Sequence, residues 1–178
     1  MKTKITLVIS ILFIMESCML IKITESGLNQ KEKNPLLIGN NISIVSTGEI
    51  NINKQDFYPS SFLIETENKT IYIDPIMLKN PKKADYIFIT HGHLDHFSIK
   101  DLKKIIKTET KIICPRKVAK KLQNFPIKVI SPGDVLNLNG ITCEAVAAYN
   151  TRPVFLGLYA HRQKAKNAGY ILTMNNKR

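Results

Sequence analysis

Short apolar runs separated by polar turns dominate the chain from residue 41 onward. Where apolar residues alternate with polar ones, or form brief continuous runs, the pattern predicts strands rather than helices. Such runs cover residues 42–45, 49–53, 62–66, 70–73, 85–89, 110–114, 128–130, 135–138 and 141–146. The dipeptide Asn139-Gly140 between the last two runs is typical of a tight hairpin turn.

Two stretches between these strands have helical spacing instead. Ser98 and Asp101 form a capping box that begins a helix through Lys107. Its apolar positions recur on one face, at Ile99, Leu102, Ile105 and Ile106. A second, basic helix is predicted over residues 116–124. Strands that alternate with helices, with hairpins at both ends, predict a layered α/β domain.

The first 23 residues have a different pattern. Lys2 and Lys4 precede the apolar run 5–15, which is the pattern of a secretory signal. Residues 15–18 resemble a bacterial lipoprotein cleavage box, in which Cys18 becomes the lipid-modified N-terminus, although Glu16 departs from the small residues usual there. An uncleaved membrane helix over residues 5–23 is the alternative.

These patterns predict three regions and a location. Residues 1–23 are expected to be a signal peptide or lipoprotein anchor, residues 24–40 a polar linker, and residues 41–178 one domain. The protein is then an exported, membrane-anchored lipoprotein on the periplasmic or cell-surface face.

Charge and cysteine content narrow the range of partners. The 178 residues carry a formal net charge of +12, which favours anionic partners, unless the lysines are only a solvated surface. No basic run is interleaved with aromatic residues, which argues against a nucleic-acid partner. Cys114 and Cys143 lie in apolar runs and fit core positions.

The candidate chemistry is concentrated in residues 90–96, directly after the predicted strand 85–89. Three of the four histidines of the chain fall here, as His91, His93 and His96, together with Asp95. Imidazole nitrogens and carboxylate oxygens are ligands of divalent metals, and the carboxyl end of a strand is where open α/β sheets bind ligands. Residues two apart in a loop can converge on one ion, and Asp95 and His96 can face a second. A surface histidine cluster is the alternative.

Two further residues are candidates for the same site. Asp74 follows the strand 70–73, where it either supports a metal-binding histidine or forms a turn with Pro75. His161 lies in a polar loop between Arg152 and Lys164, where it is either a ligand or an ordinary surface residue. Arg152 and Arg162 could meet an anionic substrate.

Residues 90–96, Thr-His-Gly-His-Leu-Asp-His, resemble the metal-binding signature of the metallo-β-lactamase superfamily. Residues 61–65 and 70–75 resemble the strand pair that precedes this signature. Residues 132–134 and 144–150 resemble downstream strands of small hydrolases related to ascorbate-6-phosphate lactonase. The resemblance spans about residues 42–178.

The resemblance implies an αββα sandwich whose C-terminal part is missing from this sequence. It implies that His91, His93 and His161 hold a first ion, and that Asp95 and His96 hold a second or Asp95 acts as a base. The ions would be one or two Zn²⁺, with Mn²⁺ or Fe²⁺ as alternatives. A bridging Asp and a last His of the family have no counterpart here, so the second ion and catalysis itself stay open.

The function implied is hydrolysis of an ester, lactone, amide or phosphoester by a metal-bound hydroxide. The substrate would be a small molecule, and an anionic one is compatible with the charge of the chain. Two alternatives remain: a truncated, non-catalytic metal-binding chain, and a nuclease or phosphodiesterase of the same superfamily.

Overall fold

The structure, a computed structural model, describes most of the chain beyond residue 60. The described residues are 23–25, 34–39, 41–47, 50–52, 55–57, 61–153 and 157–178. The predicted signal peptide with Cys18, and much of the predicted linker, lie outside them. None of the helices that the structure describes has the length and apolar content needed to cross a bilayer.

The largest element is a mixed sheet of seven strands, in the order β10-β9-β8-β7-β6-β3-β2. The pairs β7–β8, β8–β9 and β9–β10 are parallel, whereas the pairs β7–β6, β6–β3 and β3–β2 are antiparallel. Their bounds are β2 Leu36–Ile38, β3 Ile42–Ser46, β6 Phe62–Thr66, β7 Thr70–Ile73, β8 Tyr86–Phe88, β9 Lys111–Cys114 and β10 Ile127–Val129. The parallel part places the carboxyl ends of β7, β8 and β9 at one edge of the sheet.

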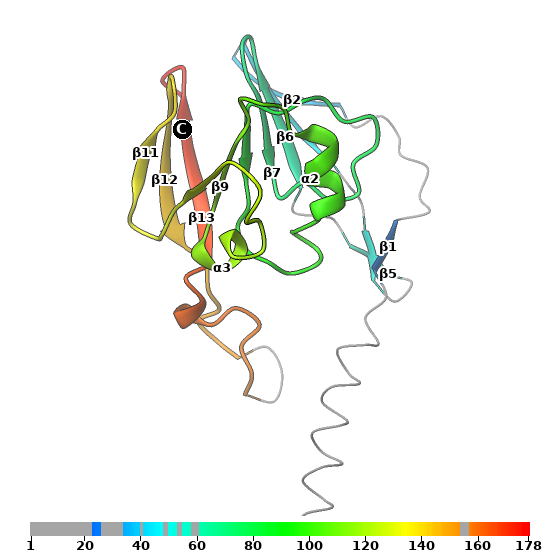
Figure 1. Ribbon diagram of the computed structural model, residues 1–178, viewed down its shortest axis with the longest axis vertical. Helices are drawn as coiled ribbons and strands as arrows, with labels where there is room; N and C mark the ends of the chain where they lie inside the picture. The colour runs from blue at the N-terminus through cyan, green and yellow to red at the C-terminus, as the bar shows by residue number, and fades with distance from the viewer. Residues whose placement is uncertain are drawn as a thin grey trace, which may run out of the picture.

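A second sheet of three antiparallel strands lies against the first (Figure 1). It contains β11 Val135–Asn137, β12 Ile141–Ala147 and β13 Ala168–Met174. The β11–β12 turn is the one predicted from Asn139-Gly140, and both residues have positive φ, 47° and 92°. A small third sheet contains β1 Ile23–Glu25, β4 Ile50–Ile52 and β5 Gln55–Phe57.

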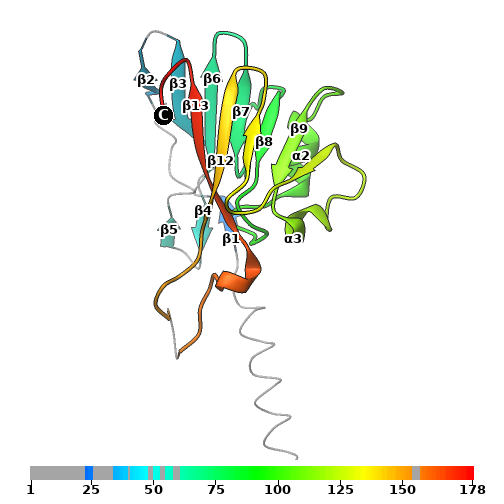
Figure 2. The same ribbon diagram turned by 90° about the vertical axis from the view of Figure 1, so that its left-hand side faces the viewer.

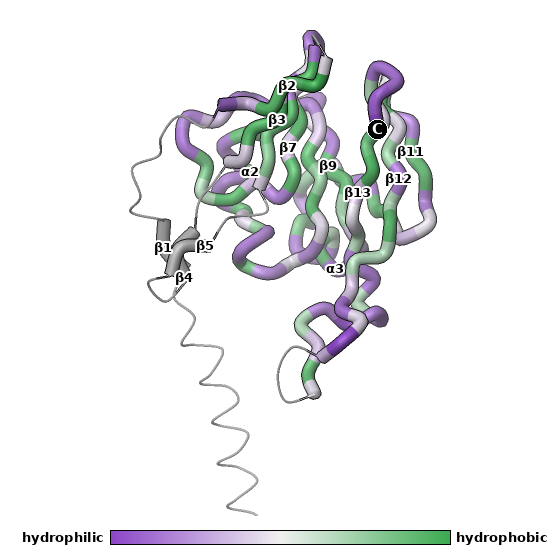
Figure 3. Tube along the Cα trace, turned by 180° about the vertical axis from the view of Figure 1, so that it is seen from behind, coloured by the Kyte–Doolittle hydropathy of each residue, from purple (hydrophilic) through white to green (hydrophobic). Residues whose placement is uncertain are grey.

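The strands of the large sheet bury both faces, because alternate residues point to opposite sides. Tyr86, Phe88 and Ile113 pack toward the second sheet, against Ile141, Cys143, Ala145, Ala168 and Met174. Ile87 and Ile112 pack on the other face, against Leu102, Ile105, Val118 and Leu122. Figure 2 shows the second sheet in front of the first, and Figure 3 shows hydrophobic residues along the strands with hydrophilic turns between them.

Two short helices cover the outer face of the large sheet. Helix α2, Ile99–Ile105, begins at Ser98, whose Oγ accepts from the Asp101 backbone N–H at 3.2 Å, as the predicted capping box requires. Helix α3 covers Arg116–Ala119. Burial raises the pKa of the Cys114 thiol to about 12 and that of Cys143 to about 11, so both are inert core residues, as predicted.

Two sequence predictions need correction, and one strand lies beyond those predicted from the pattern. Helix α3 ends at Ala119 instead of Asn124, because Lys121, Leu122 and Phe125 donate to carbonyls three residues back and the chain continues as tight turns. Part of the predicted linker is a strand, because the apolar residues 36–38 pair with β3. Strand β13 follows the last strand predicted from the pattern and pairs with β12 along its whole length.

Candidate metal centre

The candidate centre lies at the carboxyl edge of the parallel strands. Asp74 follows β7 and donates its N–H to the Phe88 carbonyl at 2.8 Å, and the loop 90–96 follows the neighbouring β8. Ile89 donates its N–H to the Ile113 carbonyl of the β9 strand at 2.9 Å. Sheet pairing therefore fixes the start of the loop on both sides, and the loop opens at the point where α/β sheets bind ligands.

Asp74 organises the loop from beneath. The residue is fully buried, and its carboxylate accepts from the Thr90 N–H at 2.7 Å, the Thr90 hydroxyl at 2.6 Å and His96 Nδ1 at 2.9 Å. Burial raises the pKa of Asp74, and the hydrogen bonds from His96 and Thr90 offset part of that rise. Of the two interpretations of Asp74, the geometry favours support of a histidine over a simple turn.

These bonds determine the tautomers of two histidines. Thr90 gives its only hydroxyl proton to Asp74, so its oxygen can only accept from His91 Nδ1, which lies 2.9 Å away. The neutral forms of His91 and His96 that satisfy these bonds carry the proton on Nδ1, so that Nε2 is unprotonated and has a lone pair that a metal can take. A carboxylate behind a ligating imidazole is the usual support of a metal-binding histidine.

His161 reaches this loop from the connection between β12 and β13. Its backbone N–H donates to the Asn150 side-chain oxygen at 2.8 Å, and the Asn150 N–H donates to the His161 carbonyl at 2.9 Å. Its Nε2 lies 3.0 Å from His91 Nε2. The ligand atoms of His91, His93 and His161 all lie within 4.8 Å of one another.

The electrostatics favour the neutral imidazole, the form that binds metals, at His91 and His161 but not at His96. Burial, with the neighbouring histidines, lowers the pKa of His91 to about 3. Burial also lowers the pKa of His161. Burial alone would lower the pKa of His96, but the hydrogen bond and charge of Asp74 raise it above its ordinary value.

The donor set fits one divalent ion. Zn–N bonds of about 2.0–2.1 Å at tetrahedral angles place ligand nitrogens about 3.3 Å apart, close to the 3.0 Å between the His91 and His161 nitrogens. Three imidazoles with an open fourth position are the ligand set of a catalytic zinc site.

A second group shares one of these residues. His91, Asp95 and His96 also have ligand atoms within 4.8 Å of one another, and Asp95 Oδ2 lies 3.5 Å from His96 Nε2. His91 can bind only one ion, through Nε2, because its other ring nitrogen, Nδ1, is hydrogen-bonded to Thr90. If the first ion takes His91, the described residues leave two ligands, Asp95 and His96, for a second.

Comparison with known families agrees with this geometry. The model of a beta-lactamase superfamily domain matches residues 57–178, well over half of the 178 residues. The chain belongs to the beta-lactamase superfamily. The metallo-β-lactamase resemblance of residues 90–96 and the predicted metallo-β-lactamase-like fold are thereby confirmed.

Individual relatives match this chain over shorter segments than the family model does. A UPF0173 metal-dependent hydrolase of Staphylococcus aureus strain MRSA252 is 36% identical over 75 residues, which cover 37% of this chain and 32% of the relative. The chain thus spans about a third of the length of the curated relative it matches.

Two solved structures show the fold. A candidate metal-dependent hydrolase of Parabacteroides distasonis is 30% identical, with a TM-score of 0.57 over 74% of this chain and 60% of that one. A diiron beta-hydroxylase of Streptomyces venezuelae has a TM-score of 0.53 at 11% identity, over 77% of this chain and 28% of that one. The second likeness concerns the fold alone.

The structure brings together the five residues predicted as metal ligands: His91, His93, Asp95, His96 and His161. Their role as ligands stays a prediction, as does the role of Asp95 as a base. Sequence reasoning missed the parts played by Thr90 and Asn150. Thr90 opens the recognised signature and could have been examined, but nothing in the local sequence indicates that Asn150 pairs with His161.

Proposed function

We propose that the protein is a metal-dependent hydrolase of small molecules. The observation that carries the proposal is the convergence of three imidazoles from two distant segments, the loop 90–96 and His161, in a chain of the beta-lactamase superfamily. The name of the staphylococcal relative, a metal-dependent hydrolase, supports the same activity.

The chain's own residues have distinct parts in this proposal. His91, His93 and His161 would hold the first ion. Asp74 would support His96 directly and His91 through Thr90, so that each of these two histidines presents an unprotonated Nε2. Zn²⁺ suits this nitrogen-rich set, and Mn²⁺ or Fe²⁺ are the alternatives. When bound, the ion supplies a Lewis acid and activates water near neutral pH.

Asp95 is the residue proposed to act on the attacking water. Its side chain is 38% exposed at the mouth of the site, so a water can reach it. It either joins His96 in holding a second ion or accepts a proton from the water. The bond broken is that of an ester, lactone, amide or phosphoester.

The first test is metal content. We expect the purified chain to bind one Zn²⁺ per molecule, and His93→Ala to lose it. Leu94→Ala is the matched control, because Leu94 lies in the same loop, is 73% exposed and offers no ligand atom. The zinc content of each protein is measured by mass spectrometry after gel filtration. A His93→Ala protein with unchanged zinc would show that His93 is not a metal ligand.

The second test is hydrolysis. We expect the metal-loaded chain to hydrolyse activated esters, lactones, amides or phosphoesters, and the chelated chain to lose that activity. Binding of metal with no hydrolysis above the chelated protein, over all four bond types, would favour the non-catalytic alternative.

We also propose that residues 1–23 direct export and that Cys18 is lipid-modified. The support is the sequence pattern of Lys2, Lys4, the apolar run 5–15 and Cys18. We expect the expressed protein to partition into detergent and to carry added acyl mass on Cys18, and we expect Cys18→Ser to lack that mass. A wild-type protein in the aqueous phase would argue against the lipid anchor.

A further inference from the structure

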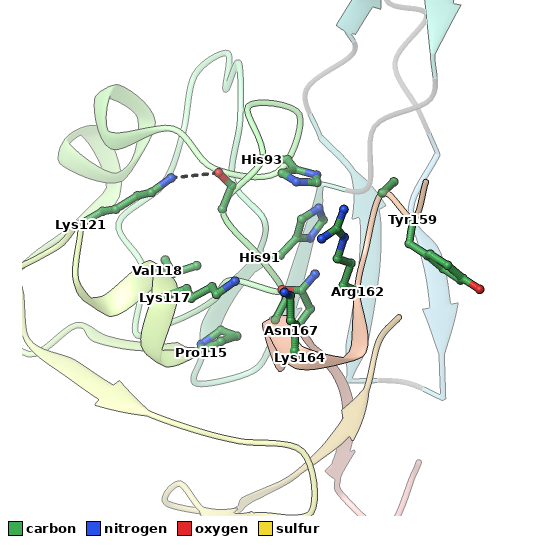
Figure 4. Close-up of a pocket in the computed structure, with 13 residues that line it drawn as sticks. His91, His93, Pro115, Lys117, Val118, Lys121, Tyr159, Arg162, Lys164 and Asn167 are labelled. Carbon is green, nitrogen blue, oxygen red and sulfur yellow. Dashed lines mark hydrogen bonds between the residues drawn. The ribbon is translucent and has the colours of Figure 1, made fainter. Parts of the chain in front are cut away.

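A cavity of about 300 Å³ opens beside the histidines, between the α3 segment and the segment that leads into β13. His91 and His93 form part of its wall (Figure 4). Pro115, Val118 and Ala165 contribute apolar surface. The volume is at the lower end of the range of small-molecule sites, about 300–1,000 Å³. The cavity therefore suits a compact ligand.

The charged residues that line this cavity are all cationic. Lys117 and Lys121 come from the α3 side, and Arg162 and Lys164 come from the opposite side, around the short helix η1 (Gln163–Ala165). Figure 4 shows Arg162 extending alongside His91 and Lys117 extending toward Asn167. Among the described residues, no carboxylate lines the cavity.

Most of these cations are available to a ligand. Lys121 donates to the Gly92 carbonyl at 3.2 Å, a bond that leaves its positive charge uncompensated. In the part of the chain that the structure describes, no acidic side chain forms an ion pair with Lys117, Arg162 or Lys164. Cations of one sign in a cleft raise the local concentration of anions.

We propose that the substrate carries an anionic oxygen group, a carboxylate or a phosphate, separate from the bond that is cleaved. This group binds between Lys117 and Arg162, while the scissile bond lies against His91 and His93. The inference rests on the proposed hydrolase function and specifies its substrate class. The guanidinium of Arg162 matches the two oxygens of either group, and Lys117 adds a point charge.

A compact anion fits these observations better than a nucleic acid does. A polynucleotide needs a basic surface along its backbone and aromatic side chains for its bases. Here the four cations surround a single small cavity.

The test compares two esters of nearly equal shape, mono-4-nitrophenyl succinate and 4-nitrophenyl butyrate. The first carries a carboxylate where the second ends in a methyl group. We expect the metal-loaded full chain to prefer the succinate ester. We expect Lys117→Met/Arg162→Met to lower the ratio of the two kcat/KM values about tenfold or more, because two charge-assisted contacts are lost.

The control removes the same charge elsewhere. Lys120→Met/Lys128→Met changes two exposed lysines that do not line the cavity, and it should leave the ratio within about twofold of the wild type. A wild type that hydrolyses both esters equally, or an equal loss of preference in both double variants, would overturn the inference and leave the hydrolase proposal intact.

A binding measurement separates the two proposals. Calorimetric titration of the chelated chain with inorganic phosphate or succinate needs no hydrolysis and no metal. We expect binding that Lys117→Met/Arg162→Met weakens and Lys120→Met/Lys128→Met does not. The tighter of the two anions identifies the substrate group.

Each remaining outcome has one meaning. Anion binding with no hydrolysis of either ester, nor of the lactones, amides and phosphoesters of the second test, would overturn the hydrolase proposal and retain an anion site. Hydrolysis of the neutral ester without anion binding would retain the hydrolase proposal and overturn the anion site. A single-stranded RNA oligomer that binds more tightly than either anion, with a steep salt dependence, would replace the small anion by a nucleic acid.

Discussion

At the scale of single residues, one carboxylate controls two proposed ligands. Asp74 bonds directly to His96 and, through the Thr90 hydroxyl, to His91. Its backbone has a φ of 47°, a conformation that Asp and Asn adopt more readily than most residues. The short side chain and the left-handed backbone together place the carboxylate under the loop.

The first prediction is that Asp74→Asn weakens metal binding about 10- to 100-fold, the usual effect of losing a carboxylate behind a ligating histidine. Asn tolerates the positive φ and can still accept from the Thr90 N–H. It cannot accept from the Thr90 hydroxyl and His96 together with the strength of a carboxylate, so both tautomers lose their constraint. Zinc affinity measured by competition with a chromophoric chelator provides the comparison.

Asp85→Asn is the matched control for this prediction. Asp85 immediately precedes β8 and, like Asp74, accepts from a backbone N–H, that of Thr70 at 2.8 Å, and it also accepts from Lys107 Nζ at 2.8 Å. It contacts none of the histidines in these hydrogen bonds. Equal zinc affinities in the two variants would show that Asp74 does not position the ligands.

At the scale of elements, helix α2 anchors the chain that follows β7. Asp101 lies in its first turn, and its carboxylate accepts from the Met77 N–H at 2.8 Å and the Leu78 N–H at 3.2 Å. Lys104 pairs with it at 2.6 Å. The capping box was predictable from Ser98 and Asp101, but the use of Asp101 to cap a distant loop was not, because Met77 and Leu78 lie more than 20 residues away.

The second prediction concerns the acid stability of this anchor. Burial alone would raise the pKa of Asp101, but the bonds from Lys104 and from the Met77 N–H hold it below its ordinary value. The carboxylate therefore stabilises the fold above the unfolded pKa of about 3.9, and this stability is lost as the pH falls through the lower folded pKa. We expect Asp101→Asn to cost about 1–3 kcal/mol at pH 7 and progressively less in acid.

Urea unfolding at several pH values between neutral and strongly acidic checks this. The curves of free energy of unfolding against pH should converge for the wild type and Asp101→Asn as the pH falls. Parallel curves would mean that Asp101 is bonded equally in both of its protonation states. Asp134→Asn, at an exposed turn where Oδ2 accepts from the Ser131 N–H, serves as the control.

The same scale shows which elements the sequence could specify. The strands with alternating or continuous apolar residues formed, with bounds within one or two residues. In the central strands β8 and β9 the physical reason is burial, because Ile87 and Ile112 are fully buried on the large sheet. The α3 prediction failed because its apolar positions, Val118 and Leu122, also suit tight turns that bury the same side chains. Periodicity alone does not separate these two backbones.

The site was predictable where its residues are consecutive. His91, His93, Asp95 and His96 could be grouped as ligands because they lie in the one loop 90–96. For His161, the sequence left a metal ligand and an ordinary surface residue as equal alternatives. Its position depends on Asn150 and on the return of the chain into β13, contacts between residues far apart in sequence.

At the scale of the whole molecule, the candidate centre joins the two sheets. His91 and His93 lie in the loop after β8 of the large sheet, and His161 lies in the connection between β12 and β13 of the second sheet. Two bonds reinforce this junction: the Tyr170 hydroxyl donates to the Ile89 carbonyl at 2.7 Å, and the Ala168 N–H donates to the Thr90 carbonyl at 3.1 Å. A metal held by ligands from both layers therefore binds only the assembled fold.

The last prediction follows from that geometry. Binding to the native state alone stabilises it by RT ln(1 + [L]/Kd), about 2.7 kcal/mol when free zinc is 100 times Kd. We expect added Zn²⁺ to raise the melting temperature of the wild type by several degrees and a chelator to reverse the effect. In His161→Ala, the remaining ligands come from one loop of one sheet, so the zinc-induced rise should be largely lost. Arg152→Ala changes an exposed residue of the same connection that belongs to neither ligand group, and it should keep the rise. An equal rise in both variants would place His161 outside the metal centre.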